Sequence, residues 1–68
     1  MKAVSGKEMC RILERHGWQL LRIRSSHHIY GRSGVPFTIP VPVHGKRTLK
    51  VGTQRSIMKR AGLTEADL

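Results

Sequence analysis

Two adjacent histidines, His27 and His28, are the residues of this sequence best suited to chemistry. Imidazole is the side chain whose ordinary pKa allows proton transfer near neutrality. Two interpretations stay open: one ring is a general acid or base, or both are ordinary polar residues of a strand. A shared metal ion is disfavoured, because adjacent strand residues point to opposite faces and no carboxylate or thiol stands at ligand spacing.

Basic residues lie on both sides of the histidine pair and outnumber acidic residues in the whole chain. The 68 residues include 13 Lys and Arg against 4 Asp and Glu, a formal net charge of +9. Because so much like charge costs stability unless a partner uses it, we expect a track that binds the phosphate groups of an anionic partner. The candidate contacts to this partner, which are RNA contacts if the partner is RNA, are Arg22, Arg24, Ser26, His28, Lys46, Arg47, Lys50 and Thr53.

The other reactive or aromatic residues have simpler interpretations. Cys10 is flanked by apolar residues in a predicted helix, with no base placed to activate it, and a single cysteine forms no internal disulfide. Trp18 and Tyr30 could stack on a base, but core packing is favoured for both. His44 could help to bind phosphate or could pack against Pro42.

Two segments have the pattern of capped helices. Ser5 followed by Glu8 forms a capping box, which starts a helix over about 6–16. A second helical pattern covers about 51–61. Each helix is followed by a glycine that can adopt the left-handed conformation of a helix end, Gly17 and Gly62.

Three apolar runs between the helices predict strands over 18–24, 27–30 and 37–43. Alternation in the first places Leu21 and Ile23 on one face.

The third run contains Pro40 and Pro42, whose missing amide protons fall on the same side of the strand. Phe37, Ile39, Val41 and Val43 can then share a face. This is the pattern of an edge strand whose open edge is blunted.

This order of elements predicts an α+β fold, a small two-layer α-β-β-β-α domain over 1–68. Both helices cover one face of a three-stranded antiparallel meander. The apolar stretches, such as Leu20-Leu21, are too short for a membrane span or a signal peptide, so we expect a cytoplasmic protein. So small a chain leaves little room for an enclosed pocket, so we expect an open-surface function without a cofactor.

Further motifs cover nearly the whole chain: Ser25-Ser-His-His-Ile-Tyr30, Ile39-Pro-Val-Pro-Val-His44-Gly45, Leu49-Lys-Val-Gly-Thr53, Arg55-Ser-Ile57 and Ala61-Gly-Leu63. In order and spacing they resemble the HicA toxins of bacterial and archaeal HicA–HicB toxin–antitoxin pairs. The resemblance implies a double-stranded-RNA-binding-domain-like fold. It also implies a metal-independent endoribonuclease that acts on mRNA and is inhibited by a HicB-type antitoxin.

The same resemblance implies that His27 is the catalytic histidine, because the family histidine follows a Gly-Ser pair. Two positions depart from the family pattern: Ser25 replaces the motif glycine, and Val51 replaces a residue that is usually proline. Alternation alone does not choose His27, since a core-facing Ile29 would leave His28 as the exposed ring. The alternative function is a non-catalytic double-stranded-RNA-binding-like module. A DNA-binding protein is disfavoured, because no helix-turn-helix pattern is present.

Overall fold

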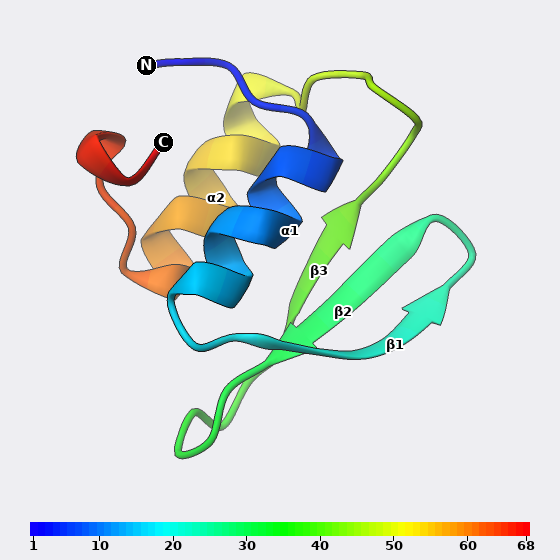
Figure 1. Cartoon of the computed structure of the whole chain (residues 1–68), viewed down its shortest axis with the longest axis vertical. Coiled ribbons are helices and arrows are strands. Elements are labelled where there is room, and N and C mark those ends of the chain that lie inside the picture. The colour runs from blue at the N-terminus through cyan, green and yellow to red at the C-terminus, as the bar shows by residue number, and fades with distance from the viewer.

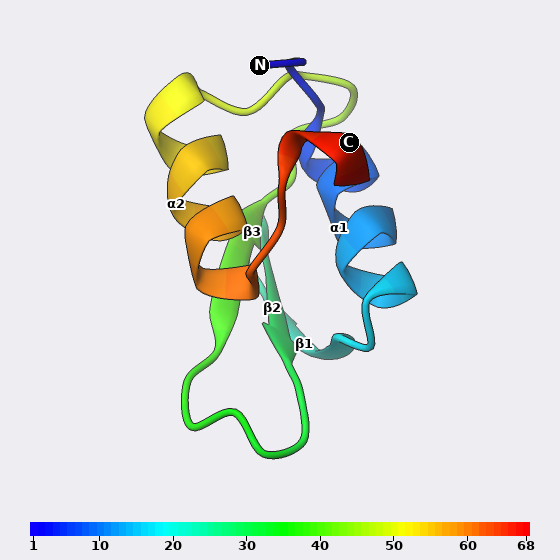
Figure 2. The same ribbon diagram turned by 90° about the vertical axis from the view of Figure 1, so that its left-hand side faces the viewer.

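Two helices lie side by side on one face of a three-stranded antiparallel sheet (Figure 1 and Figure 2). The structure, a computed structural model, describes residues 1–68. Its elements are α1 (Gly6–Arg15), β1 (Gln19–Arg24), β2 (His27–Gly31), β3 (Ile39–Pro42), α2 (Val51–Ala61) and a final 3-10 turn, η1 (Glu65–Asp67). The predicted α-β-β-β-α order in two layers is confirmed.

Helix α1 begins and ends where its sequence signals predict, to within one residue. The Ser5 hydroxyl accepts a hydrogen bond from the Glu8 amide at 3.0 Å, and the Glu8 carboxylate accepts one from the Ser5 amide at 2.9 Å. These bonds satisfy backbone donors that the first turn of a helix leaves free. Gly17 has a φ of 86°, which turns the chain out of the helix toward the sheet.

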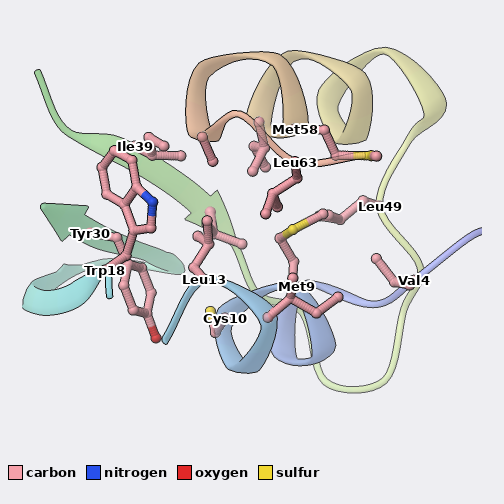
Figure 3. Packing of buried hydrophobic residues seen from close by; sticks show 14 residues of the cluster. Val4, Met9, Cys10, Leu13, Trp18, Tyr30, Ile39, Leu49, Met58 and Leu63 are labelled. Atoms are coloured by element: carbon pink, nitrogen blue, oxygen red, sulfur yellow. The ribbon is translucent and has the colours of Figure 1, made fainter. Parts of the chain in front are cut away.

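Fourteen buried apolar side chains form the core between the helices and the sheet (Figure 3). Met9 and Leu13 of α1 and Ile39 of β3 all belong to this core and are fully buried. Trp18 and Tyr30 are 2% and 1% exposed, so their predicted place in the core is confirmed. Neither ring is available to stack on a base.

A buried amide side chain fixes the beginning of α2. Gln54 is 1% exposed; its side chain donates a hydrogen bond to the Lys2 carbonyl at 2.6 Å and accepts one from the Val4 amide at 3.1 Å. The Leu49 amide donates to the Val4 carbonyl at 2.8 Å. The N-terminal segment therefore holds the residues that lead into α2. No helix of the structure combines the length and the apolar character needed to cross a membrane.

Strand β3 is an edge of the sheet, as its prolines predict. Ile39 and Val41 are fully buried, and the Val43 amide donates to the Ser26 carbonyl at 2.8 Å. Val43 directs its amide toward β2, and successive residues of a strand direct their amides to opposite sides. Pro40 and Pro42 therefore place their nitrogens, which carry no proton, on the outer side of β3. The blunted edge is confirmed.

The predicted extension of β3 to Phe37 is wrong. β2 pairs only as far as Tyr30 with Ile39, and the chain before Ile39 belongs to the connecting loop. Phe37 is 38% exposed, with its ring centroid 6.2 Å from that of Trp18. Without a partner strand at this position, Phe37 covers the edge of the core instead of entering it.

A β-bulge interrupts β1. Leu20 pairs with Tyr30, while Arg22 pairs with Ile29, the next residue along β2, so Leu21 is an extra residue without a partner. A bulge of this kind breaks the alternation of side chains between the two faces of a strand.

The bulge overturns the predicted grouping of Leu21 with Ile23. Leu21 lies over Gly31, where an added Cβ would meet its Cδ1 at 2.7 Å, and so shares the open face with Arg22. Ile23 lies opposite His28, on the side that faces the helices. The predicted strand also starts one residue early, because Trp18 precedes β1 and points into the core.

Candidate active site on the open face of the sheet

His27 lies on the face of the sheet that the helices leave open. Tyr30 points into the core, so alternation along β2 puts His28 on the helix side and both His27 and Ile29 on the other. Ile29 is 7% exposed but is not part of the core cluster between the layers. Of the two histidines, His27 is therefore the exposed ring, and His28 is half-buried.

Cationic side chains adjoin His27 on this open face. Arg24 is its cross-strand partner on β1, and Arg22, opposite Ile29, follows on the same face. A shallow hollow there is lined by Arg24, Ser25, His27, Ile29 and Pro40. No carboxylate lines it. An imidazole beside guanidinium groups can exchange a proton with a bound phosphate ester and can stabilise added negative charge on the ester.

The turn that presents His27 is strained at Ser25. Ser25 and Ser26 connect the paired residues Arg24 and His27, and Ser25 has a φ of 55°, the one positive φ outside glycine in the chain. Hairpin turns of two residues require a positive φ at the first position, where glycine is favoured. The turn therefore forms with serine at the position where the resemblance leads us to expect glycine.

We expect Ser25→Gly to raise the free energy of unfolding by roughly 1 kcal/mol, because glycine adopts a positive φ without steric cost. Urea denaturation would measure the change. Ser26→Gly is the matched control: Ser26 has no positive φ, so the added chain entropy of glycine should make this variant slightly less stable. If the Ser25→Gly protein were less stable than wild type, the backbone at Ser25 would not be strained.

A second basic hollow lies at the beginning of α2. It is lined by Pro42, His44, Arg47, Thr48, Leu49, Lys50 and Thr53. Lys50 is the N-cap of α2 and makes no capping hydrogen bond through its side chain. The amides of the first helical turn and the cations around them favour an anion. Pro42 lines this hollow and is the cross-strand partner of His27, so the hollow adjoins the face that carries His27.

The structure gathers most but not all of the predicted RNA contacts in these two places. Arg22 and Arg24 share the face of His27, and Arg47, Lys50 and Thr53 line the hollow at α2. Four predicted contacts line neither hollow: Arg22, which shares the open face, Ser26 in the turn, His28 on the helix side and Lys46 in the exposed loop before α2. Their roles stay predictions.

Two residues that support the site were missed. An added Cβ on Gly6 would stand 2.0 Å from the Pro42 carbonyl oxygen, so α1 touches the end of β3 beside His27. Gln54 ties the N-terminal segment to α2. The sequence contained weak signals for both residues. Gly6 stands in the first turn of a helix, where glycine costs stability, and Gln54 is a polar residue on an apolar helical face.

The titratable groups with shifted pKa values lie away from the open face. Burial raises the pKa of the Cys10 thiol, so this residue stays protonated near neutrality. Burial, together with a hydrogen bond to Glu14, also raises the pKa of Tyr30, whose hydroxyl donates to the Glu14 carboxylate at 2.6 Å. No three His, Cys, Asp or Glu side chains are grouped as a metal site would require.

A family model supplies the identity of the chain. The model for the HicA toxin of bacterial toxin–antitoxin systems matches residues 6–63. The matched range runs from the first residue of α1 to just beyond α2 and includes both hollows. No curated protein matches this sequence. The chain belongs to the HicA toxin family of bacterial toxin–antitoxin systems.

Proposed function

We propose that this toxin is a metal-independent endoribonuclease that cleaves mRNA in the cytoplasm. His27 acts as its general acid or base, and Arg22, Arg24 and Lys50 contact phosphates. The observation that carries the proposal is the exposed His27 ring paired across the strands with Arg24, on an open sheet face without a carboxylate. An open face can receive a polynucleotide that no enclosed pocket of so small a chain could hold.

RNA supplies its own nucleophile for this reaction. The imidazole of His27 accepts the proton of a ribose 2′-hydroxyl, and the oxygen attacks the adjacent phosphorus. The bond to the 5′-oxygen of the next nucleotide breaks, leaving a 2′,3′-cyclic phosphate, and the 5′-oxygen takes up a proton. Arg22 and Arg24 offset the charge that develops on the phosphoryl oxygens.

The hollow at α2 supplies a second phosphate contact. Lys50 and Arg47 bring positive charge to the free amides at the beginning of the helix. Because this hollow and the His27 face meet at Pro42, one RNA strand can occupy both. Binding there fixes the register of the strand while the chemistry takes place at His27.

The reaction is tested on matched substrates in EDTA. We expect the purified protein to cleave RNA with EDTA present and to leave all-2′-deoxy and 2′-O-methyl versions of the same sequence intact, because both lack the nucleophile. Loss of RNA cleavage in EDTA, or cleavage of the deoxy substrate, would contradict the mechanism. A protein that binds but cleaves no RNA would be the non-catalytic RNA-binding module.

We expect Lys50→Ala to weaken RNA binding and to lower the slope of log affinity against log salt by about 1, because one phosphate contact is lost. Fluorescence anisotropy across a salt series would measure both. Lys59→Ala is the matched control, since it removes the same charge from the last turn of α2, outside the basic hollow. If both variants lose the same RNA affinity, Lys50 contributes only through the net charge of the protein.

The partner that we propose is a HicB-type antitoxin with an acidic contact surface. Membership of a toxin–antitoxin family implies an antitoxin, and the net charge of +9 favours acidic residues on it. Association of oppositely charged surfaces weakens as salt rises.

A further inference from the structure

Strand β1 exposes apolar side chains at an edge of the sheet. It is the outermost strand opposite β3 and extends beyond the helices (Figure 1). All six of its residues are exposed. Leu20, Leu21 and Ile23 are 44%, 53% and 56% exposed, which is unusual for apolar residues placed together in so short a strand.

Backbone groups of Ile23 point away from the sheet. The Val43 amide donates to the Ser26 carbonyl, so Ser26 and alternate residues of β2 direct their backbone groups toward β3. His27, between them, directs its backbone toward its β1 partner, Arg24. Ile23 then faces outward, with an amide and a carbonyl available to another strand.

The side chains around this open position alternate in chemistry. Arg22 and Arg24 lie on the open face, while Ile23 between them lies on the helix side. A strand added here would need carboxylates on one face and apolar side chains on the other.

We propose that the antitoxin binds by adding an extended acidic–apolar segment to β1. Its backbone pairs with Ile23, its carboxylates lie beside Arg22 and Arg24, and its apolar residues cover Leu20 and Ile23. The inference rests on the proposed antitoxin partner and names the surface that it occupies. Main-chain hydrogen bonds supply affinity in this mode, and the alternate side chains supply specificity.

Charge and chemistry favour this occupant over two others. A second copy of the chain paired about Ile23 would set Arg22 opposite Arg24, and each copy carries a net charge of +9. RNA has no backbone that continues a β-ladder, and its bases stack on aromatic rings instead of the aliphatic side chains found here.

The interface would inhibit the toxin from beside its active site. Carboxylates next to Arg22 and Arg24 compete with the phosphates that we assign to these arginines. The imidazole of His27, on the neighbouring strand, need not be covered. His27→Ala should therefore bind the antitoxin as wild type does.

Amide exchange of Ile23 tests the inference directly. The probes are the product of the adjacent gene, which we propose to be the HicB-type antitoxin, and a single-stranded RNA oligonucleotide, each added to the 15N-labelled protein. The Ile23 amide should exchange quickly in the free protein and become protected in the antitoxin complex. An unprotected Ile23 amide in a formed complex, or protection by RNA alone, would overturn the inference.

Ile23→Pro tests the backbone contact separately from the side chain. Proline removes an amide that faces outward, so β1 should still pair with β2. Antitoxin binding should weaken roughly tenfold or more beyond the effect of Ile23→Ala, which keeps the amide. Equal affinities for the two variants would overturn the strand addition. RNA cleavage by Ile23→Pro reports on the ribonuclease proposal independently, because Ile23 has no assigned role in it.

Charge reversal provides a second test that does not depend on proline. Arg22→Glu with Arg24→Glu should weaken antitoxin binding far more than Lys7→Glu with Arg11→Glu, which makes the same change of charge at exposed positions of α1. Equal losses would show an effect of net charge alone and overturn the proposed surface. Failure of wild type to bind the antitoxin would overturn the partner and this inference together, while cleavage of RNA would still stand or fall by itself.

Discussion

Replacing His27 by alanine should lower the rate of RNA cleavage by a factor on the order of 10² to 10⁴, the usual contribution of a positioned acid or base. No other imidazole or carboxylate lines its hollow, so nothing nearby can take over the proton transfer. The exposed ring contributes little to packing, and the stability of the fold should be unchanged. Single-turnover cleavage, with thermal unfolding as a check on folding, would measure both.

His28→Ala is the matched control for this experiment. It removes the same ring from the adjacent position, but His28 is half-buried on the helix side and lines neither hollow. Its effect on cleavage should be much smaller. A His27→Ala protein that cleaves RNA at the wild-type rate would remove the assigned role and favour the non-catalytic RNA-binding module.

Gly6→Ala should lower the free energy of unfolding by about 1–3 kcal/mol, the usual cost of overpacking. The added Cβ would stand 2.0 Å from the Pro42 carbonyl oxygen, 3.0 Å from its carbonyl carbon and 3.1 Å from the Val43 Cα. All three are backbone atoms and cannot rotate away. Helix propensity favours alanine by roughly 1 kcal/mol, so a net loss would show that the clash outweighs propensity.

Gly52→Ala is the control for that measurement. Gly52 also lies in the first turn of a helix, but an added Cβ there meets nothing within 4 Å. Alanine should therefore stabilise α2 by up to about 1 kcal/mol. If urea denaturation gives both variants the same gain, α1 does not contact β3 as closely as described. Because Pro42 pairs with His27, Gly6→Ala should also reduce cleavage.

Local sequence signals were sufficient to predict the two helices and the blunted edge of β3. The capping box at Ser5 and the glycines after each helix act within a few residues of the chain, so their effects can be read without knowledge of tertiary contacts. The proline pair of β3 depends only on the alternation of backbone amides along one strand.

The faces of the strands could not be predicted in the same way. The bulge at Leu21 depends on how β1 pairs with β2, and pairing between strands is not recorded in the alternation of either strand alone.

The choice between His27 and His28 was undetermined for a related reason. Ile29 and Tyr30 are both able to fill a core, and alternation cannot say which of them does. The hydroxyl of Tyr30 bonds to Glu14 of α1, a contact between residues that are distant in the sequence. The close approach of Gly6 to Pro42 is equally non-local.

The two prolines of β3 leave the sheet with one edge, that of β1, at which another strand can be added. An incoming strand needs outward-facing amide protons, and the β3 edge lacks them at Pro40 and Pro42 while β1 keeps that of Ile23. If only one edge of a sheet can accept a strand, the hydrogen-bonded ladder of strands ends at that sheet. Each copy of this toxin can therefore accept a single strand, which favours closed one-to-one units over filaments even where antitoxin and toxin are abundant.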